Sequence, residues 1–207
     1  MGAVGPDIAT AAVVFATIFV VELPDKTFIA TLVMATRFRP LLVWIGVSLA
    51  FLVQTAIAVL AGGLLARLPR TPVEVFAGVL FLVGGIVLLR GAGRADEEEA
   101  RTEAEFGKKT ARAVVGWRVV TLCFTVLFLA EWGDLSQLLT ASLVVRYDDA
   151  ASVFVGAFLA LVTVSGLAAA LGRTLLARMR LSTIRRVGGT VCLVLAAYTA
   201  LEIAGVV

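Results

Sequence analysis

The sequence predicts an all-α membrane protein whose six transmembrane helices form two inverted three-helix repeats. Two bulk properties predict the class, because 60% of the 207 residues are hydrophobic and the mean hydropathy is +1.02, far above soluble composition. A third observation, an acidic motif that occurs in two apolar segments, predicts the repeats. Charged residues make up only 16% of the chain, so the composition excludes soluble enzymes and nucleic-acid-binding proteins.

Six apolar runs are long enough to cross a bilayer as helices, which takes about 20 residues each. Short connections that are polar or contain proline, such as the one at Pro40, separate these runs. We therefore expect six spans. The runs cover residues 8–35, 41–66, 73–90, 116–144, 150–176 and 184–206.

A hydrophilic segment separates the third run from the fourth. Its sequence, RADEEEARTEAEFGKKTAR at 94–112, has an acidic block and alternating charges, which are typical of a solvated helix or a flexible linker. Cation sensing by the carboxylates of Asp96 to Glu99 is the alternative to a plain connector. The predicted units are a first three-helix repeat at 1–92, an acidic cytosolic linker at 93–113 and a second three-helix repeat at 114–207.

The distribution of lysine and arginine predicts the orientation in the membrane. Most of the 18 basic residues lie in the connections after the first, third and fifth runs, whereas Arg67, Arg70 and Arg146 belong to the other side. Because lysine and arginine are enriched on the cytoplasmic side, we expect the linker in the cytoplasm and both termini outside. The expected location is a bacterial plasma membrane.

The two halves of the chain repeat one another. FATIFVVELPDKTFIAT at 15–31 aligns without a gap with FTVLFLAEWGDLSQLLT at 124–140, so that Glu22 matches Glu131. Each half has three spans, an odd number, and the second half therefore enters the bilayer upside down relative to the first. Inverted repeats of this kind are typical of secondary transporters, which bind their substrate near the midplane.

Four carboxylates lie inside the first and fourth runs, namely those of Glu22, Asp25, Glu131 and Asp134. Residues three apart share one face of a regular helix, and the inverted repeat would bring the two pairs together near the bilayer centre. Each ionised carboxylate costs at least about 2.5 to 3.5 kcal/mol at that depth. Lys26 compensates one charge, and protons, a bound cation or both must meet the others.

Each motif also contains a residue that weakens the helix. Pro24 cannot donate a backbone hydrogen bond and Gly133 relaxes the chain at the matching place, so freed carbonyls become possible ligands. A kinked helix without a role is the alternative. Hydroxyl and amide groups next to the breaks join the site only if the helices are broken, and polar residues of the second and fifth runs are weaker candidates. The first group is Thr27, Ser136 and Gln137, and the second is Gln54, Thr55 and Ser165.

The available ligand atoms predict the kind of ion. The chain has no histidine, and Cys123 and Cys192 lie inside apolar runs, so copper and zinc lack their preferred ligands. Carboxylate, carbonyl, hydroxyl and amide oxygens suit Ca²⁺, Mg²⁺ or Mn²⁺. We expect a divalent cation as cargo, protons as the coupling ion and no resident cofactor.

The segments ELPDKT at 22–27 and AEWGDLSQ at 130–137 resemble the paired Glu-x-Gly-Asp-Lys/Arg-Thr/Ser motifs of the manganese/calcium cation:proton antiporter family. That family includes Golgi and chloroplast transporters and bacterial manganese exporters, and the resemblance covers essentially the whole chain. It implies that Glu22, Asp25, Glu131 and Asp134 bind the cation and exchange protons, with Thr27, Ser136 and Gln137 as accessory ligands. Two positions depart from the pattern, because Pro24 replaces a glycine and Leu135 replaces a basic residue.

The sequence thus predicts a transporter that exchanges Mn²⁺, or alternatively Ca²⁺, for protons and exports the metal from the cytoplasm. The expected partners are the divalent cation, protons and the lipid bilayer, without nucleic acid, and a homo-oligomer is left open. One alternative is an exporter of small organic cations or amino acids. Another is an intramembrane aspartyl protease that uses Asp25 and Asp134, although this gives Glu22 and Glu131 no role.

Overall fold

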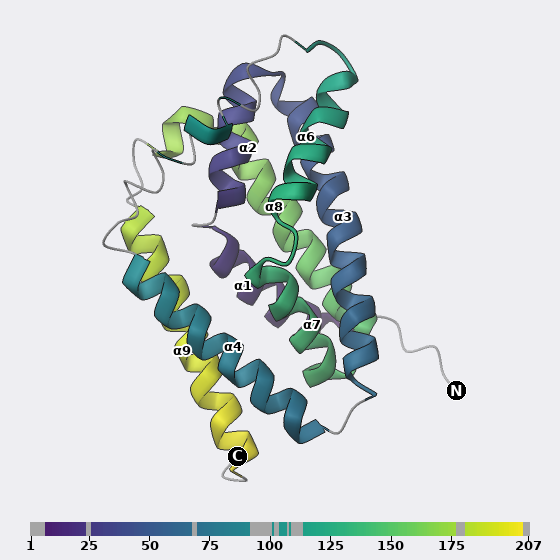
Figure 1. The fold of residues 1–207 in the computed structure, drawn as a ribbon, viewed down its shortest axis with the longest axis vertical. Coiled ribbons are helices and arrows are strands. Elements are labelled where there is room, and N and C mark those ends of the chain that lie inside the picture. The colour runs from purple at the N-terminus through teal and green to yellow at the C-terminus, as the bar shows by residue number, and fades with distance from the viewer. Residues whose placement is uncertain are drawn as a thin grey trace.

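The computed structural model describes residues 7–23, 26–67, 70–91, 101, 104–106, 108, 114–176 and 181–204. Within these ranges every regular element is a helix and none is a strand, which confirms the predicted all-α class. Pro24, Asp25 and the acidic block Asp96 to Glu99 lie outside the described residues. The helices are α1 (Ile8–Glu22), α2 (Lys26–Arg37), α3 (Pro40–Leu65), α4 (Arg70–Gly91), α6 (Arg118–Ala130), α7 (Leu135–Tyr147), α8 (Ala150–Leu176) and α9 (Leu181–Ile203) (Figure 1).

Two of the helices, α3 and α8, are long and apolar enough to span a membrane on their own. The predicted first and fourth runs each form two helices instead of one, with bends of 70° between α1 and α2 and 73° between α6 and α7. Counting each bent pair as one span gives up to four candidates in the described part of the chain. The apolar stretches of α4 and α9 are shorter, at Gly78–Gly91 and Cys192–Leu201.

The second bend has a local cause in the sequence. Helix α6 ends at Ala130, and Gly133 then adopts φ +77°, in the left-handed region that favours glycine. Asp134 returns to an extended conformation, with φ −69° and ψ 164°, and α7 begins at the next residue. Gly133, which the sequence predicts as a break in the backbone, thus lies in the turn between α6 and α7.

Nearly all the helix contacts join one half of the chain to the other. Helix α8 packs on α1, α2 and α3, while α3 also packs on α6 and α7. Helices α4 and α9 pack mainly on each other along one side of the molecule (Figure 1). Within a half, the main contacts that the structure gives are α2 with α3 and α7 with α8. The two halves are thus interleaved and share one core.

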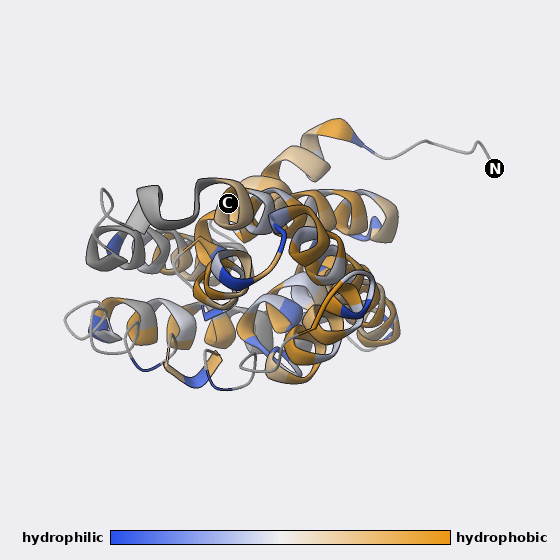
Figure 2. Ribbon diagram, turned by 90° about the horizontal axis from the view of Figure 1, so that it is seen from above, coloured by the Kyte–Doolittle hydropathy of each residue, from blue (hydrophilic) through white to orange (hydrophobic). Residues whose placement is uncertain are grey.

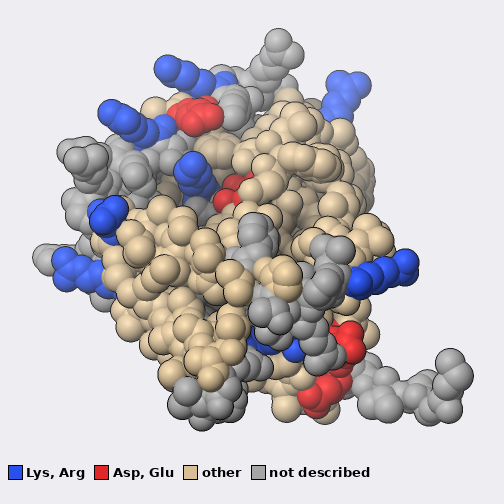
Figure 3. Space-filling view, turned by 60° about the horizontal axis from the view of Figure 1, so that its bottom comes forward, with Lys and Arg blue, Asp and Glu red and all other residues tan. Residues whose placement is uncertain are grey.

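The outer surface is apolar, as lipid contact requires. Most of the helical ribbon in Figure 2 has the colour of hydrophobic residues, and Leu129 and Trp132 are 69% and 63% exposed. In Figure 3 most of the visible Lys and Arg side chains lie toward the margins of the face, and uncharged residues cover much of the described surface between them. An exposed apolar surface of this extent is typical of helices that face lipid.

Matching residues of the two halves make matching contacts. A Cβ atom on Gly46 would lie 2.9 Å from the Cβ of Cys123, and one on Gly156 would lie 2.9 Å from the Cβ of Val14. The stacked rings of Phe15 and Phe19, with centroids 5.6 Å apart, correspond to those of Phe124 and Phe128, 5.5 Å apart. The same shift in residue number that relates the two acidic motifs also relates these pairs, to within a single position.

Replacing Gly156 by alanine is expected to lower the melting temperature of the purified protein by several degrees. The new methyl group would meet the backbone carbonyl of Ala11, which cannot turn away as a side chain does, and overpacking of this kind costs roughly 1–3 kcal/mol. Thermal unfolding in detergent measures the effect. Gly63→Ala is the control on α3, because a Cβ there meets nothing within 4 Å. Equal melting temperatures for the two variants would contradict the close contact of α8 with α1.

Candidate functional site

The two helix breaks lie at the same level of the molecule. In Figure 1, α2 and α6 occupy the upper half and α1 and α7 the lower half, so each bent pair breaks between the two ends of the long helices α3 and α8. The bent pairs also contact each other, because α1 packs on α7 and α2 on α6. The helix ends on either side of the two breaks therefore lie in the central part of the molecule.

The glutamates of both motifs are buried at the C-terminal ends of half-helices. Glu22 is the last residue of α1 and is 1% exposed, and Glu131 follows α6 as its C-cap and is 5% exposed. Carbonyl groups at such an end have no partner within the helix and carry partial negative charge. Each of the two glutamates is thus a buried carboxylate at a helix end that carries partial negative charge.

The neighbouring motif residues have different environments. Thr27 is buried, and its Oγ1 donates a hydrogen bond of 3.3 Å to Oε2 of Glu22. Lys26 is exposed at the start of α2. Asp134 is partly exposed and is the N-cap residue of α7, without a side-chain capping hydrogen bond. Because α6 ends at Ala130 and α7 begins at Leu135, Glu131 and Asp134 do not share a helical face, and the expectation based on the three-residue spacing was wrong.

A small cavity adjoins Glu131. The cavity has a volume of about 10 Å³, which is close to the space that one water molecule needs. Its polar lining comes from the second motif, from Thr140 of α7 and from α3, and its apolar lining from α3 and α8. The lining residues are Phe51, Gln54, Thr55, Ala58, Glu131, Ser136, Gln137, Thr140 and Leu161.

Gln137 stabilises the broken segment. Its Nε2 donates a hydrogen bond of 2.7 Å to the backbone oxygen of Glu131, and its Oε1 accepts one of 3.3 Å from the backbone N–H of Gly133. One side chain thus bonds to two backbone groups of the same turn. Gln137 therefore fixes the backbone that presents Glu131, a task the sequence did not predict for it.

Gln54 bonds to the end of α6 from the opposite side of the cavity. Its Nε2 donates a hydrogen bond of 3.2 Å to the backbone oxygen of Phe128, in the last turn of that helix. A carbonyl oxygen only accepts hydrogen bonds, so the amide nitrogen must face Phe128. The amide oxygen of Gln54 is therefore the atom left for other partners.

The structure brings together only part of the predicted site. Gln54, Thr55, Glu131, Ser136 and Gln137 line one cavity. The other described candidates, Glu22, Thr27, Asp134 and Ser165, are not among its lining residues, and Asp25 lies outside the described residues. In the part of the chain that the structure describes, no three Asp, Glu, Cys or His side chains are grouped closely enough to hold a metal ion.

One lining residue with a hydroxyl group was missed by the sequence analysis. Thr140 is buried, and its Oγ1 donates a hydrogen bond of 2.7 Å to the backbone oxygen of Ser136. The signal was present, because residues four apart on a helix share a face and Ser136 was already a candidate. Thr140 also matches Thr31 in the repeat, whose buried hydroxyl has no hydrogen-bond partner among the described residues.

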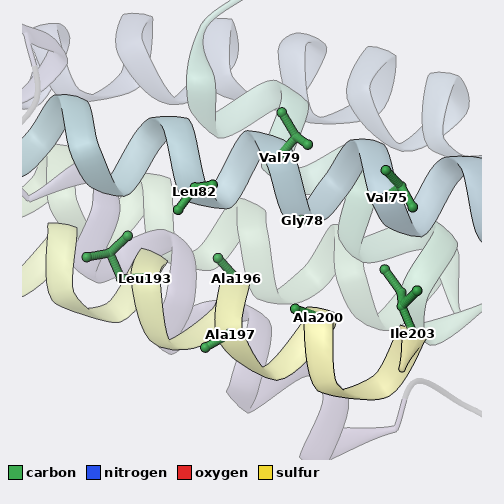
Figure 4. Close-up of a pocket in the computed structure, with 9 residues that line it drawn as sticks. All are labelled: Val75, Gly78, Val79, Leu82, Leu193, Ala196, Ala197, Ala200 and Ile203. Carbon is green, nitrogen blue, oxygen red and sulfur yellow. The ribbon is translucent and has the colours of Figure 1, made fainter. Parts of the chain in front are cut away.

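A wider groove between α4 and α9 is a poor cation site. It has a volume of about 390 Å³, and Figure 4 shows side chains such as Leu82 and Leu193 along it. Every lining residue is valine, leucine, isoleucine, alanine or glycine, so the side chains supply no oxygen ligand. The cavity at Glu131 therefore remains the candidate for binding an ion.

Comparison with known families gives two matches, one in each half of the chain. The family model described as "Divalent cation/proton antiporter GDT1" matches residues 10–96 and 119–205. The two matched segments are equally long, and the shift in residue number between them is the one that carries Glu22 onto Glu131.

Several curated proteins are similar over most of the chain. The GDT1-like protein sll0615 of Synechocystis is 31% identical over 180 residues, which cover 83% of this chain and 87% of that protein. The GDT1-like protein 3 of Oryza sativa subsp. indica is 32% identical over 190 residues, and the match covers 85% of this chain and 68% of that protein. The chloroplastic protein PAM71 of Arabidopsis thaliana is 32% identical, over 91% of this chain and 56% of its own length. No solved structure matches the chain.

Proposed function

Because the chain belongs to the family of divalent cation/proton antiporters described as GDT1, we propose that it exchanges Mn²⁺ for protons and exports Mn²⁺ from the cytoplasm. The family consists of membrane transporters, so the chain is a transporter and not an enzyme. This excludes the aspartyl protease considered from the sequence. The organic-cation exporter loses support for the same reason, because the family description specifies divalent cations.

The observation that carries the proposal is the buried carboxylate of Glu131 beside a cavity of single-ion size. The polar groups around it are hydroxyls and amides, whose oxygens suit a hard cation such as Mn²⁺ or Ca²⁺. The C-terminal end of α6 adds partial negative charge at the same place. Transporters with broken helices bind their coupling cations at such half-helix ends.

The proposed architecture has six spans in two inverted repeats, at 1–92 and 114–207, joined by the linker at 93–113. In this arrangement the bent pairs are the first and fourth spans, and α4 and α9 are the third and sixth. The paired family matches and the repeated glycine and phenylalanine contacts support it. The excess of lysine and arginine beside the linker supports a cytoplasmic linker with both termini outside, in a bacterial plasma membrane.

In the proposed mechanism, Glu22, Asp25, Glu131 and Asp134 bind either the metal or protons. Deep in the membrane several carboxylates cannot all remain charged without compensation. A divalent cation that enters therefore displaces protons from them, and protons that return displace the cation. Alternating exposure of the site to the two sides of the membrane would couple these exchanges to transport. Thr27, Ser136 and Lys26 support the carboxylates through hydrogen bonds and charge.

Proteoliposomes test the proposal directly. When Mn²⁺ is added outside vesicles that contain a pH-sensitive dye, protons should leave the lumen in exchange, and the luminal pH should rise. Ca²⁺ in place of Mn²⁺ distinguishes the two candidate metals, and lysine tests the organic-cation alternative. Vesicles without protein serve as the control. An unchanged luminal pH with both metals, in vesicles shown to contain folded protein, would reject the proposed exchange.

A further inference from the structure

Three buried hydroxyl groups form no hydrogen bond in the part of the chain that the structure describes, those of Thr31, Ser48 and Thr55. Of these three residues only Thr55 lines the cavity at Glu131, and it is 2% exposed. Leaving a buried hydroxyl without a partner costs roughly 1–3 kcal/mol. Such a group in a native structure calls for a partner of another kind, such as a bound ion.

The preceding residue on α3 leaves an oxygen atom available in the same cavity. The nitrogen of the Gln54 amide is held by the backbone oxygen of Phe128, so the oxygen is the remaining polar atom of that side chain. Gln54 and Thr55 are both buried and both line the cavity. Helix α3 therefore brings two neutral oxygens to the wall shared with Glu131.

The matching positions of the other half differ from Gln54 and Thr55 in their polar groups. When Gly46 of α3 is aligned with Gly156 of α8, Thr55 aligns with Ser165. The Oγ of Ser165 donates a hydrogen bond of 3.0 Å to the backbone oxygen of Val162. Gln54 corresponds to Val164, which belongs to an apolar cluster with Phe28, Leu32 and Ala168. The polar wall of the cavity is thus a property of α3 and not of its counterpart α8.

We infer that Thr55 and Gln54 are ligands of the transported divalent cation, to which they supply neutral oxygens beside the carboxylate of Glu131. This inference rests on the proposed function, because it names additional ligands at the same site. Neutral ligands hold the ion without adding negative charge that further protons would have to balance. The number of charged ligands is one of the properties that set the affinity of such sites. Helix α3 of the first half thereby adds ligands beside the glutamate of the second half.

Thr55→Val tests the inference, because valine keeps the shape of threonine and replaces the hydroxyl by a methyl group. The dissociation constant of Mn²⁺ is measured on the intact protein in detergent, from the electron paramagnetic resonance signal of free Mn²⁺. The KM of Mn²⁺ transport is measured in proteoliposomes. Both constants should rise at least roughly tenfold. Thr55→Ser should restore values near those of the unaltered protein. Ser165→Ala is the matched control, since that hydroxyl is already bonded within its own helix.

The melting temperature separates a ligand from a structural residue. If Thr55 is a ligand, Thr55→Val should melt at the same temperature as the unaltered protein or above it, because the hydroxyl has no partner among the described residues. If Thr55 is only structural, the melting temperature of the variant should fall. A normal Mn²⁺ affinity and KM in Thr55→Val would overturn the inference and leave the proposed exchange untouched. An equal loss of affinity in Ser165→Ala would also overturn it. Failure of the proposed function is distinguishable, because the unaltered protein would then show no metal-dependent proton movement.

Discussion

Glu131→Gln is expected to reduce Mn²⁺-dependent proton movement roughly a hundredfold or more, the upper end of the losses caused by altering metal sites. Glutamine has nearly the same size as glutamate and accepts the same kind of contacts, but it carries no charge and releases no proton. Glu131 is buried beside the cavity and at the end of α6. The substitution therefore removes both the charge that attracts the cation and one of the groups that exchange protons.

The assay for this variant is the change in luminal pH of proteoliposomes, normalised to the amount of folded protein. Because a neutral side chain costs less to bury than a charged one, the melting temperature should stay the same or rise. Glu105→Gln is the control, since Glu105 is exposed and lies in the linker region. Normal transport by Glu131→Gln would show that the ion does not bind at this cavity.

Gly133→Ala is expected to slow transport roughly tenfold, even though a Cβ atom at this position meets nothing within 4 Å. The cost comes from the backbone, because an L-residue with a side chain in the left-handed region is strained by roughly 1–2 kcal/mol. The N–H of Gly133 donates to Gln137, which in turn bonds to the backbone oxygen of Glu131. A change of backbone angle at residue 133 is thus passed directly to the buried carboxylate.

Gly116→Ala separates this effect from general destabilisation. Gly116 also has a positive φ, +66°, and open space around its missing Cβ, but it lies ahead of α6 and away from the cavity. Both variants should lose similar thermal stability, while only Gly133→Ala should lose transport rate. Equal transport rates in the two variants would argue against the role of the Gly133 turn in positioning Glu131.

The helices were predictable because their signals are local. Each apolar run contains a helix or a bent pair of helices, since a stretch of hydrophobic residues about 20 long specifies a span without reference to the rest of the chain. The break after α6 was also visible, because glycine at residue 133 lacks the Cβ that disfavours positive φ. The bend of 73° that follows was not, because its size depends on how α6 and α7 pack on α3.

The candidate site was predicted less completely, for a related reason. The periodicity of a regular helix placed Glu131 and Asp134 on one face, and this argument fails because both residues lie in the turn between α6 and α7. The hydrogen bonds of Gln137 to two backbone groups arise from a turn whose geometry no spacing rule contains. Thr55 was only a weak candidate, because nothing local distinguishes a hydroxyl that faces a cavity from one that bonds within its own helix.

The interleaving of the two halves has a consequence for their origin. Helix α8 finds most of its neighbours in the first half, and α6 finds its main one, α3, there as well. A half-length ancestor could not have covered these surfaces alone and would have needed a second copy of itself as a dimer. Either half expressed alone should therefore expose these apolar surfaces and depend on a second polypeptide to cover them.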